Sequence, residues 1–411
     1  MTGLPGETGD RSAPLRMIAL RFLGPAGTQA LAQGLALASQ LVMIRALEAP
    51  AFGSIGLALV AVNTVCFLGE LGYGSYFLRE AARNENWIDP WRHALGLRLI
   101  VLIPSSCAAF LALHWSAPEP SAAAIVLATA APGILGSAMS PAPLLFGQGR
   151  RGAACAGILA RAGLQAILIV SAAWVQPERM ALWAGVAFSS GVLLQVLSGR
   201  VCGLSWDVMR PIFAFRPPEA TALRLWTLSL VGTLNDRVLP FVLGAAHPDI
   251  LAPALILVQV LQAMAGVGSQ VDRVLVPTLS TPQAEIRGPD GGELLRRAIV
   301  LVSAFGLVFA AGLATLAWAL LPGTQLSVAI LVGEWAAVLL GGFAFALAYS
   351  KGAERPVAAF MVRVLPLSIL LQVAAADAVP LEALLLLRLL VAAAVGWIAI
   401  DRARAACMVR P

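Results

Sequence analysis

A short polar run, Asn235, Asp236 and Arg237, interrupts an otherwise apolar stretch of the chain. Inserting a charged side chain into hydrocarbon costs about 2.5–3.5 kcal/mol, so charges in apolar stretches usually bind a ligand or pair with another charge. Successive residues of a helix point about 100° apart, so Asp236 and Arg237 would each reach partners on other helices. Two interpretations stay open: an internally neutralised structural pair, and the lining of a cavity that binds polar cargo.

Four more charges fall inside apolar stretches: Arg161, Glu334, Arg363 and Arg388. A structural interpretation pairs Glu334 with Arg363 or Arg388, because all three lie in the second half of the chain. Arg161 lacks a comparable partner, since Glu70 stands near the end of its own apolar stretch. An unpaired arginine in a water-filled cavity attracts anions, so Arg161 is a candidate to bind an anionic head group.

Three glutamines, Gln29, Gln33 and Gln40, are spaced by four and seven residues and share one helical face. Such a stripe suits hydrogen bonds between helices and suits the lining of a cavity. Asp272 and Arg273 end an apolar stretch, where we favour an anchor at the membrane surface over a substrate contact. The cavity candidates are thus Arg161, Arg237, Asp236, Asn235, Gln33 and Gln40, and the coupling or structural candidates are Glu334, Arg363, Arg388, Asp272 and Arg273.

No catalytic set is evident. The three histidines, His93, His114 and His247, fall in separate loops, and the cysteines show no metal-ligand spacing. No glycine-rich phosphate loop followed by lysine is present either, so we expect no ATP hydrolysis. The sequence favours a binding or transport protein over an enzyme, with no catalytic residue, no metal and no cofactor.

The composition indicates that the helices carrying these residues lie in a membrane. Hydrophobic residues make up 59% of the chain, charged residues only 12%, and the mean hydropathy is +0.84. Stretches of about 20 residues that are apolar on every side match the thickness of a bilayer. We predict an all-α integral membrane protein with about twelve spanning helices. They are expected near residues 22–44, 52–71, 94–115, 121–146, 153–175, 180–203, 224–246, 250–271, 297–321, 325–349, 357–376 and 380–400.

The polar stretch 204–223 divides these helices into two lobes of six, at 22–203 and 224–400. Arginines are concentrated in alternate loops. Loops rich in positive charge stay on the cytoplasmic side of a membrane. We therefore expect both termini, 1–21 and 401–411, and the linker 204–223 to be cytoplasmic. The formal charge of +6 reflects these loops and indicates no nucleic-acid partner. The predicted location is the bacterial inner membrane, crossed many times.

Several segments resemble the polysaccharide and O-antigen repeat-unit flippase family of the multidrug/oligosaccharidyl-lipid/polysaccharide exporter superfamily. Ile44 to Arg83, IRALEAPAFGSIGLALVAVNTVCFLGELGYGSYFLREAAR, resembles the region of the family's first and second helices. Gln148 to Arg151 (QGRR) resembles the turn after the fourth helix. Asn235 to Gly244 (NDRVLPFVLG) and Val276 to Ser280 (VPTLS) resemble the seventh helix and the turn after the eighth.

The resemblance implies two lobes around a cationic central cavity that opens to alternate sides of the membrane. It implies a cargo as well, an oligosaccharide on an undecaprenyl pyrophosphate carrier, flipped from the cytoplasmic to the periplasmic leaflet. Arg161 and Arg237 would then meet pyrophosphate or acidic sugar. Membrane lipids, a polysaccharide polymerase and export proteins are the other expected partners.

Three alternatives remain open. An ion-coupled small-molecule exporter of the same architecture would use a cavity dominated by carboxylates, such as Asp236 and Glu334. A membrane-embedded polymerase or ligase would carry a large periplasmic loop, whereas the predicted outer loops are short. A non-transporting subunit of a polysaccharide-synthesis complex would not depend on the buried arginines.

Overall fold

The computed structural model describes residues 13–83, 86–214, 217–280, 325–350, 355–375 and 378–408, together with isolated residues between 300 and 315. These residues form helices joined by short turns, with no strand in any of these ranges. The helices are α1 (Ala13–Ala46), α2 (Ala49–Glu70), α3 (Tyr73–Arg83), α4 (Ile88–Ser116), α5 (Pro120–Ala138), α6 (Ala142–Gly147), α7 (Arg151–Val175), α8 (Met180–Val201), α9 (Ala220–Ala246), α10 (Pro248–Ser280), α12 (Gln325–Ser350), α13 (Arg355–Ala375) and α14 (Leu381–Met408). The all-α fold expected from the sequence is confirmed.

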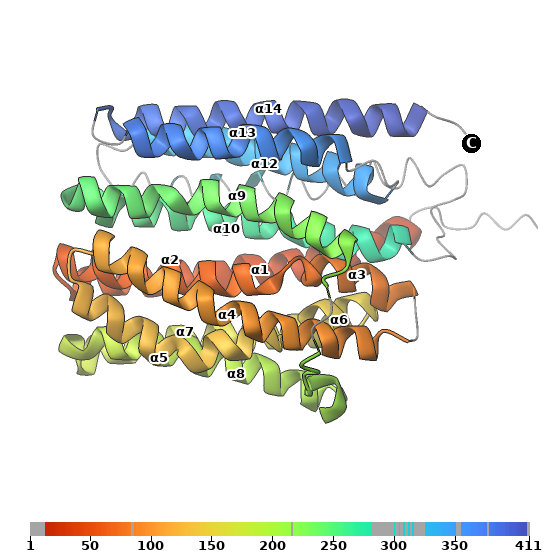
Figure 1. Ribbon diagram of the computed structural model, residues 1–411, viewed down its shortest axis with the longest axis horizontal. Coiled ribbons are helices and arrows are strands. Elements are labelled where there is room, and N and C mark those ends of the chain that lie inside the picture. Colours follow the sequence, from red (N-terminus) through yellow and green to blue (C-terminus); the bar gives the residue numbers. More distant parts are fainter. Residues whose placement is uncertain are drawn as a thin grey trace, which may run out of the picture.

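The long helices run side by side in one bundle (Figure 1). Helices α1 to α8, the N-terminal half, pack mainly on one another. In the C-terminal half, α9 to α14, helices α12, α13 and α14 pack within the half, whereas α9 and especially α10 also pack on the N-terminal half. The two halves meet along a seam where α1 and α2 contact α9 and α10. Helix α1 begins and α14 ends at the same end of the bundle, which we call the terminal end, and the opposite end is the far end. The predicted domain boundary at 204–223 stays a prediction.

The outside of the bundle is apolar, as a lipid-facing surface must be. Seven of the described helices are long and apolar enough to cross a membrane, and two shorter apolar helices lie at Pro248–Ala263 and Leu326–Gly341. Exposed tryptophans mark both margins of this apolar band: Trp115 and Trp174 near the far end, Trp206 and Trp397 near the terminal end. Indole rings favour the membrane–water interface, so their placement fits a protein that crosses a bilayer.

Glycines bring two helices of the C-terminal half into close contact. Gly341 of α12 faces Gly396 of α14, and a Cβ added at Gly341 would lie 3.0 Å from the Gly396 Cα atom. Inside a bilayer no hydrophobic driving force brings helices together, and small residues allow the close packing that holds them. Helices α12 and α14 form one of the most extensive helix pairs in the molecule.

Three local predictions are wrong. Helix α3 stands where a loop was expected, because its aromatic residues Tyr73, Tyr76 and Phe77 pack on one another and Phe77 packs on Trp91. The segment predicted as one helix at 121–146 breaks after Ala138, near Pro141, into α5 and α6. Val276 to Ser280 continues α10 and does not form a turn. The predicted helix at 297–321 lies largely outside the described residues.

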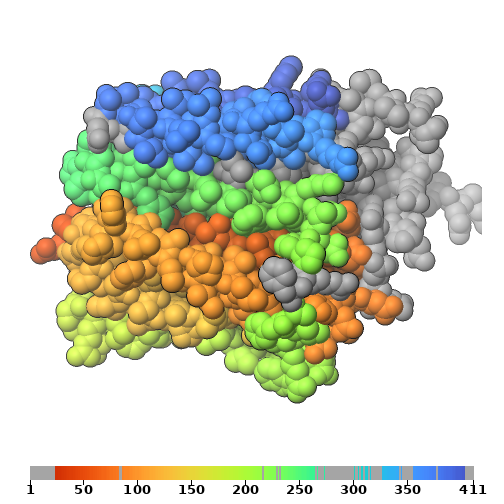
Figure 2. Space-filling view, viewed as in Figure 1, coloured from red at the N-terminus to blue at the C-terminus, as the bar shows by residue number. Residues whose placement is uncertain are grey.

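The surface view shows the seam from one side (Figure 2). On this face the green side chains of α9 lie directly against the orange ones of α4 and its neighbours.

Candidate functional site

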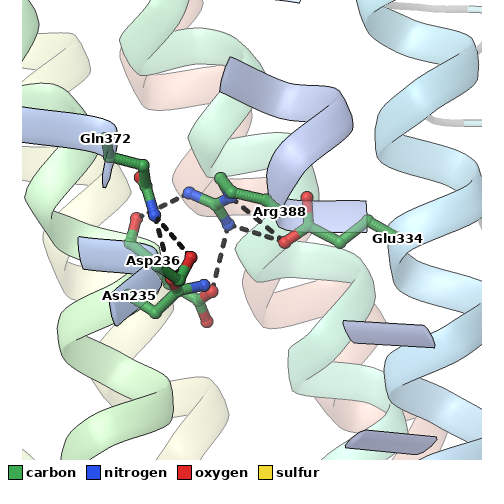
Figure 3. Close-up of polar contacts among 6 residues, drawn as sticks. Asn235, Asp236, Glu334, Gln372 and Arg388 are labelled. Atoms are coloured by element: carbon green, nitrogen blue, oxygen red, sulfur yellow. Dashed lines mark hydrogen bonds and ion pairs between the residues drawn. The ribbon is translucent and has the colours of Figure 1, made fainter. Parts of the chain in front are cut away.

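An ion cluster in the C-terminal half joins three helices (Figure 3). Arg388 of α14 lies between Glu334 of α12 and Asp236 of α9, with its Nη2 atom 2.8 Å from Glu334 Oε1 and 3.0 Å from Asp236 Oδ1. Its Nε atom also donates to Glu334 Oε1, at 3.2 Å. Both Arg388 and Glu334 are almost fully buried, at 1% and 2% exposure. The predicted pairing of Glu334 is thus confirmed with Arg388 as the partner.

A proline supplies a further oxygen to this cluster. Pro240 stands four residues after Asp236 in α9 and has no N–H to donate to the Asp236 carbonyl. That carbonyl accepts a 3.2 Å hydrogen bond from Arg388 Nη1 instead. All three guanidinium nitrogens of Arg388 are therefore hydrogen-bonded, as a buried cation requires.

Asn235 belongs to a separate neutral network next to the ion cluster. Its Oδ1 atom accepts hydrogen bonds from Ser368 Oγ and Gln372 Nε2 of α13, both at 2.8 Å. Asn235, Ser368 and Gln372 are all buried. These contacts fasten α9 to α13, which makes Asn235 a structural residue of the C-terminal half more than a residue that faces the seam.

The side chain of Arg237 extends from α9 across the seam to α2. Its Nη1 atom donates to Thr64 Oγ1 of α2 at 3.0 Å, and its guanidinium carbon lies 6.0 Å from the centre of the Phe67 ring. The internally neutralised Asp236–Arg237 pair is wrong, because Asp236 forms its ion pair with Arg388 and the two side chains point to different helices. The hydrogen-bond partner and the ring beside the Arg237 guanidinium are both uncharged.

Two more arginines approach the same part of α2. Arg161 of α7 donates to Gln195 Oε1 at 3.3 Å and lies 5.3 Å from the centre of the Phe188 ring. Arg98 of α4 donates from Nη2 to the Ser137 carbonyl at 3.3 Å. Arg98, Arg161 and Arg237 all lie close enough to Cys66 of α2 to act on its thiol electrostatically. Within the described ranges, none of the three forms an ion pair with a carboxylate.

Sequence reasoning missed Arg98. It is only 4% exposed, and its Nε and Nη1 atoms have no hydrogen-bond partner in the described structure. Helix α4 begins at Ile88, six residues before the predicted start, so Arg98 lies about 15 Å along the helix and not at a loop. The Glu70 carboxylate acts on Arg98 electrostatically but forms no ion pair with it among the described residues.

The glutamines of α1 share one helical face, as their spacing predicts, and this face lies against α10. Gln40 Nε2 donates to Gln259 Oε1 of α10 at 3.3 Å. A Cβ added at Gly266 of α10 would lie 3.1 Å from the amide nitrogens of both Gln29 and Gln33. Hydrogen bonding between helices, one of the two interpretations left open, is confirmed for Gln40.

The remaining candidates do not join these clusters. Arg363 is exposed on the face of α13 opposite to Ser368 and Gln372, so its predicted alternative pairing with Glu334 is wrong. Arg273 of α10 lies 5.8 Å from the centre of the Phe146 ring of α6, near the terminal end. The Asp272 side chain lies outside the described residues.

The seam is closed at both ends. At the far end, Leu251 packs on Gly53 of α2, where an added Cβ would lie 3.0 Å from Leu251 Cδ2. At the terminal end, Trp226 Nε1 donates to the Leu68 carbonyl at 3.2 Å. Next to it, Gly72 has a φ of +71° and sits against the α9 backbone at Ala222, so this position has no room for a side chain. Described residues of the two halves are therefore in contact near both ends of the seam.

A small cavity of about 270 Å³ opens elsewhere, between α4 and α5 near the far end. It is lined by Phe110, Leu113, His114, Pro120, Ser121 and Ala124. None of the candidate residues borders it.

Solved structures with the same arrangement of helices are transporters. An outward-facing multidrug resistance MATE family transporter of the MOP superfamily matches 98% of this chain and 100% of its own, with a TM-score of 0.65 and 14% identity. The chain has the MATE transporter fold. A MOP superfamily transporter from Pyrococcus furiosus matches 97% and 98% of the two chains, with a TM-score of 0.61 and 14% identity. A eukaryotic MATE transporter, AtDTX14, matches 96% and 98%, with a TM-score of 0.58 and 13% identity.

This fold, together with the seven described helices that are long and apolar enough to cross a membrane, supports a multi-pass membrane protein. No protein-family profile matches the sequence, and no curated protein has a significant match to it. The charged residues inside this MATE fold are accordingly interpreted from their own contacts.

Proposed function

We propose that the protein flips a lipid-linked oligosaccharide, carried on a polyprenyl pyrophosphate, between the leaflets of the bacterial inner membrane by alternating access. The observation that carries this proposal is the gathering of Arg98, Arg161 and Arg237 around Cys66, deep in the helices, without carboxylate partners among the described residues. Buried charges are normally paired, so an excess of cations invites an anionic group.

Pyrophosphate fits this arrangement by charge and by geometry. Guanidinium groups bind phosphate oxygens with two parallel hydrogen bonds, and several such groups can share the charge of a diphosphate. Arg161 and Arg237 each have a weak neutral partner, Gln195 or Thr64, that a phosphate oxygen can replace. A sugar–pyrophosphate head group cannot cross hydrocarbon alone because its polar groups would lose their hydrogen bonds, whereas the polyprenyl tail can stay in lipid.

The position of Arg237 links cargo to movement. Its hydrogen bond to Thr64 Oγ1 spans the seam between the halves. An anion that draws Arg237 away removes this contact, and the halves can then rock apart. Because the chain holds no ATP-binding motif, we expect turnover to rely on an ion gradient or on downstream consumption of the flipped product.

The deciding measurement in cells is the leaflet distribution of lipid-linked oligosaccharide in the absence of this protein. Accumulation on the cytoplasmic side, reversed by the intact chain, supports the proposal. A normal supply of lipid-linked sugar at the periplasmic face without the chain would overturn it.

A small-molecule exporter is the second candidate, and the likeness to a multidrug resistance transporter favours it. A cavity for organic cations would need free carboxylates, yet Glu334 and Asp236 are both engaged by Arg388. The Pyrococcus furiosus transporter is described by a binding pocket of reverse polarity that suggests a different function. Efflux of cationic dyes from cells that express the chain would distinguish the two candidates, since the flippase proposal predicts no such efflux.

A further inference from the structure

Two arginines lie against one tight turn at the end of α8. Helix α8 ends at Val201, and Gly203, with a φ of +85°, reverses the chain after it. Arg200 Nη1 donates to the Leu204 carbonyl at 2.9 Å. Arg150, which precedes α7, lies over Gly203, where an added Cβ would be 3.5 Å from Arg150 Nη2. Two guanidinium groups from distant parts of the chain therefore meet at this turn.

Backbone N–H groups already satisfy the end of α8. The Gly203 N–H donates to the Arg200 carbonyl at 2.8 Å, and the Leu204 N–H donates to the Gly199 carbonyl at 3.1 Å. This pair of bonds is the usual way in which a glycine closes a helix. Neither guanidinium is needed to satisfy these carbonyls.

The positive charge at the turn is not neutralised by the described residues. The Arg150 side chain is exposed and has no hydrogen-bond or ion-pair partner among them, and Arg200 donates to the described structure from Nη1 alone. The carboxylate that follows the turn, Asp207, forms an ion pair with Arg210 at 3.4 Å. The two guanidinium groups therefore have N–H donors to spare for an anion.

An exposed apolar stripe leads along α8 to the two arginines. Leu193, Leu197 and Val201 are spaced by four residues, so they share one helical face, and Val201 is 86% exposed. Beyond the turn, the exposed Trp206 ring has its centre 5.7 Å from the guanidinium carbon of Arg200. Helix α8 lies at the outer edge of the bundle (Figure 1). Apolar side chains, an interfacial tryptophan and two cations in this order match a phospholipid from its hydrocarbon chains to its phosphate.

We propose that Arg150 and Arg200 bind the phosphate of an anionic membrane phospholipid whose hydrocarbon chains lie along α8. Guanidinium groups bind phosphate oxygens with two parallel hydrogen bonds, and basic sites between the ends of membrane helices bind anionic lipid head groups. The site lies at the outer edge of the N-terminal half, not at the seam. The inference therefore goes beyond the proposed cargo and does not depend on it.

The test uses the purified full-length protein, unfolded by heat in detergent micelles that contain dioleoyl phosphatidylglycerol or dioleoyl phosphatidylcholine. A ligand that binds only the folded state stabilises it, so phosphatidylglycerol at 100 times its dissociation constant should raise the unfolding temperature by about 3 °C over phosphatidylcholine. Inorganic phosphate added to phosphatidylcholine micelles should give no such rise, because it lacks the hydrocarbon chains. An equal rise with inorganic phosphate would overturn the assignment to a lipid.

A matched pair of double variants separates this site from the general positive charge of the protein. Arg150→Gln with Arg200→Gln should abolish the difference between the two lipids. Arg224→Gln with Arg355→Gln removes the same charge from exposed positions of the C-terminal half at the same end, and it should keep the difference. Equal loss in both double variants, or no difference between the lipids in the intact protein, would overturn the proposal.

A single variant keeps the test decisive if Arg150→Gln with Arg200→Gln does not fold. Arg150→Gln alone should unfold like the intact protein in phosphatidylcholine, because its side chain has no partner to lose among the described residues. It should also lose at least half of the rise given by phosphatidylglycerol. An undiminished rise in this variant would show that the lipid does not bind at the turn.

Discussion

Asp236 and Arg237 are neighbours in α9, yet their side chains bind opposite halves of the molecule. The Asp236 carboxylate lies 3.0 Å from Arg388 of the C-terminal half, and the Arg237 guanidinium lies 3.0 Å from Thr64 Oγ1 of the N-terminal half. Two successive residues of α9 thus connect the ion cluster of the C-terminal half to a cation at the seam. A shift in either contact moves the same stretch of α9, which gives the two halves a direct mechanical connection.

Arg98 provides a test of whether the buried cations serve function or stability. Replacing buried charged groups by well-packed apolar residues of similar volume is often neutral or stabilising, by up to about 4 kcal/mol. We predict that Arg98→Met raises the unfolding temperature of the purified protein and lowers flipping of a pyrophosphate-linked lipid at least about tenfold, because about 1.4 kcal/mol of lost binding is a factor of ten. A destabilised variant that transports normally would show that Arg98 is structural.

Gly341 should tolerate no side chain, because a Cβ there would press on the Gly396 backbone. We predict that Gly341→Ala lowers the unfolding temperature. Gly163 of α7 is the matched control, since an added Cβ there meets nothing within 4 Å. Gly163→Ala should stabilise the protein by about 0.5–1 kcal/mol through helix propensity. Equal effects of the two substitutions in heat-unfolding measurements would contradict the observed contact between α12 and α14.

Locking either end of the seam should stop transport if the halves rock against each other. In a variant whose native cysteines are replaced by serine, Gly53→Cys with Leu251→Cys locks the far end, and Leu68→Cys with Trp226→Cys locks the terminal end. We expect each oxidised pair to abolish flipping and each reduced pair to restore it. Transport that continues with either end cross-linked would rule out alternating access along this seam.

Hydropathy predicted most of the helices because about 20 apolar residues in a row have few alternatives to a membrane-spanning helix. Hydropathy did not predict helix α3, since it is short and its aromatic first half is followed by charged residues; it packs on Trp91 through Phe77. The pairing of Glu334 with Arg388 was among the options that the sequence allowed, because buried opposite charges in one half must meet.

The sequence could not predict how each helix is rotated about its own axis. Where every face is apolar, periodicity does not tell which way Asp236, Arg237 or Arg161 points. Arg98 was misplaced because the start of α4 was set too late. One signal was present and unused: Pro240 follows Asp236 by four residues, a spacing that frees the Asp236 carbonyl for another donor.

The most direct test of the proposed function is flipping in vesicles that contain only this protein. A fluorescent polyprenyl-pyrophosphate sugar in the outer leaflet is quenched by an added membrane-impermeant reductant, and the protected fraction reports flipping. Flipping by the intact chain, lost in Arg161→Gln and Arg237→Gln and kept in Arg363→Gln, whose arginine is exposed, is the predicted result. Equal protection in vesicles with and without the protein, or equal loss in all three variants, would contradict a cargo bound by the arginines around Cys66.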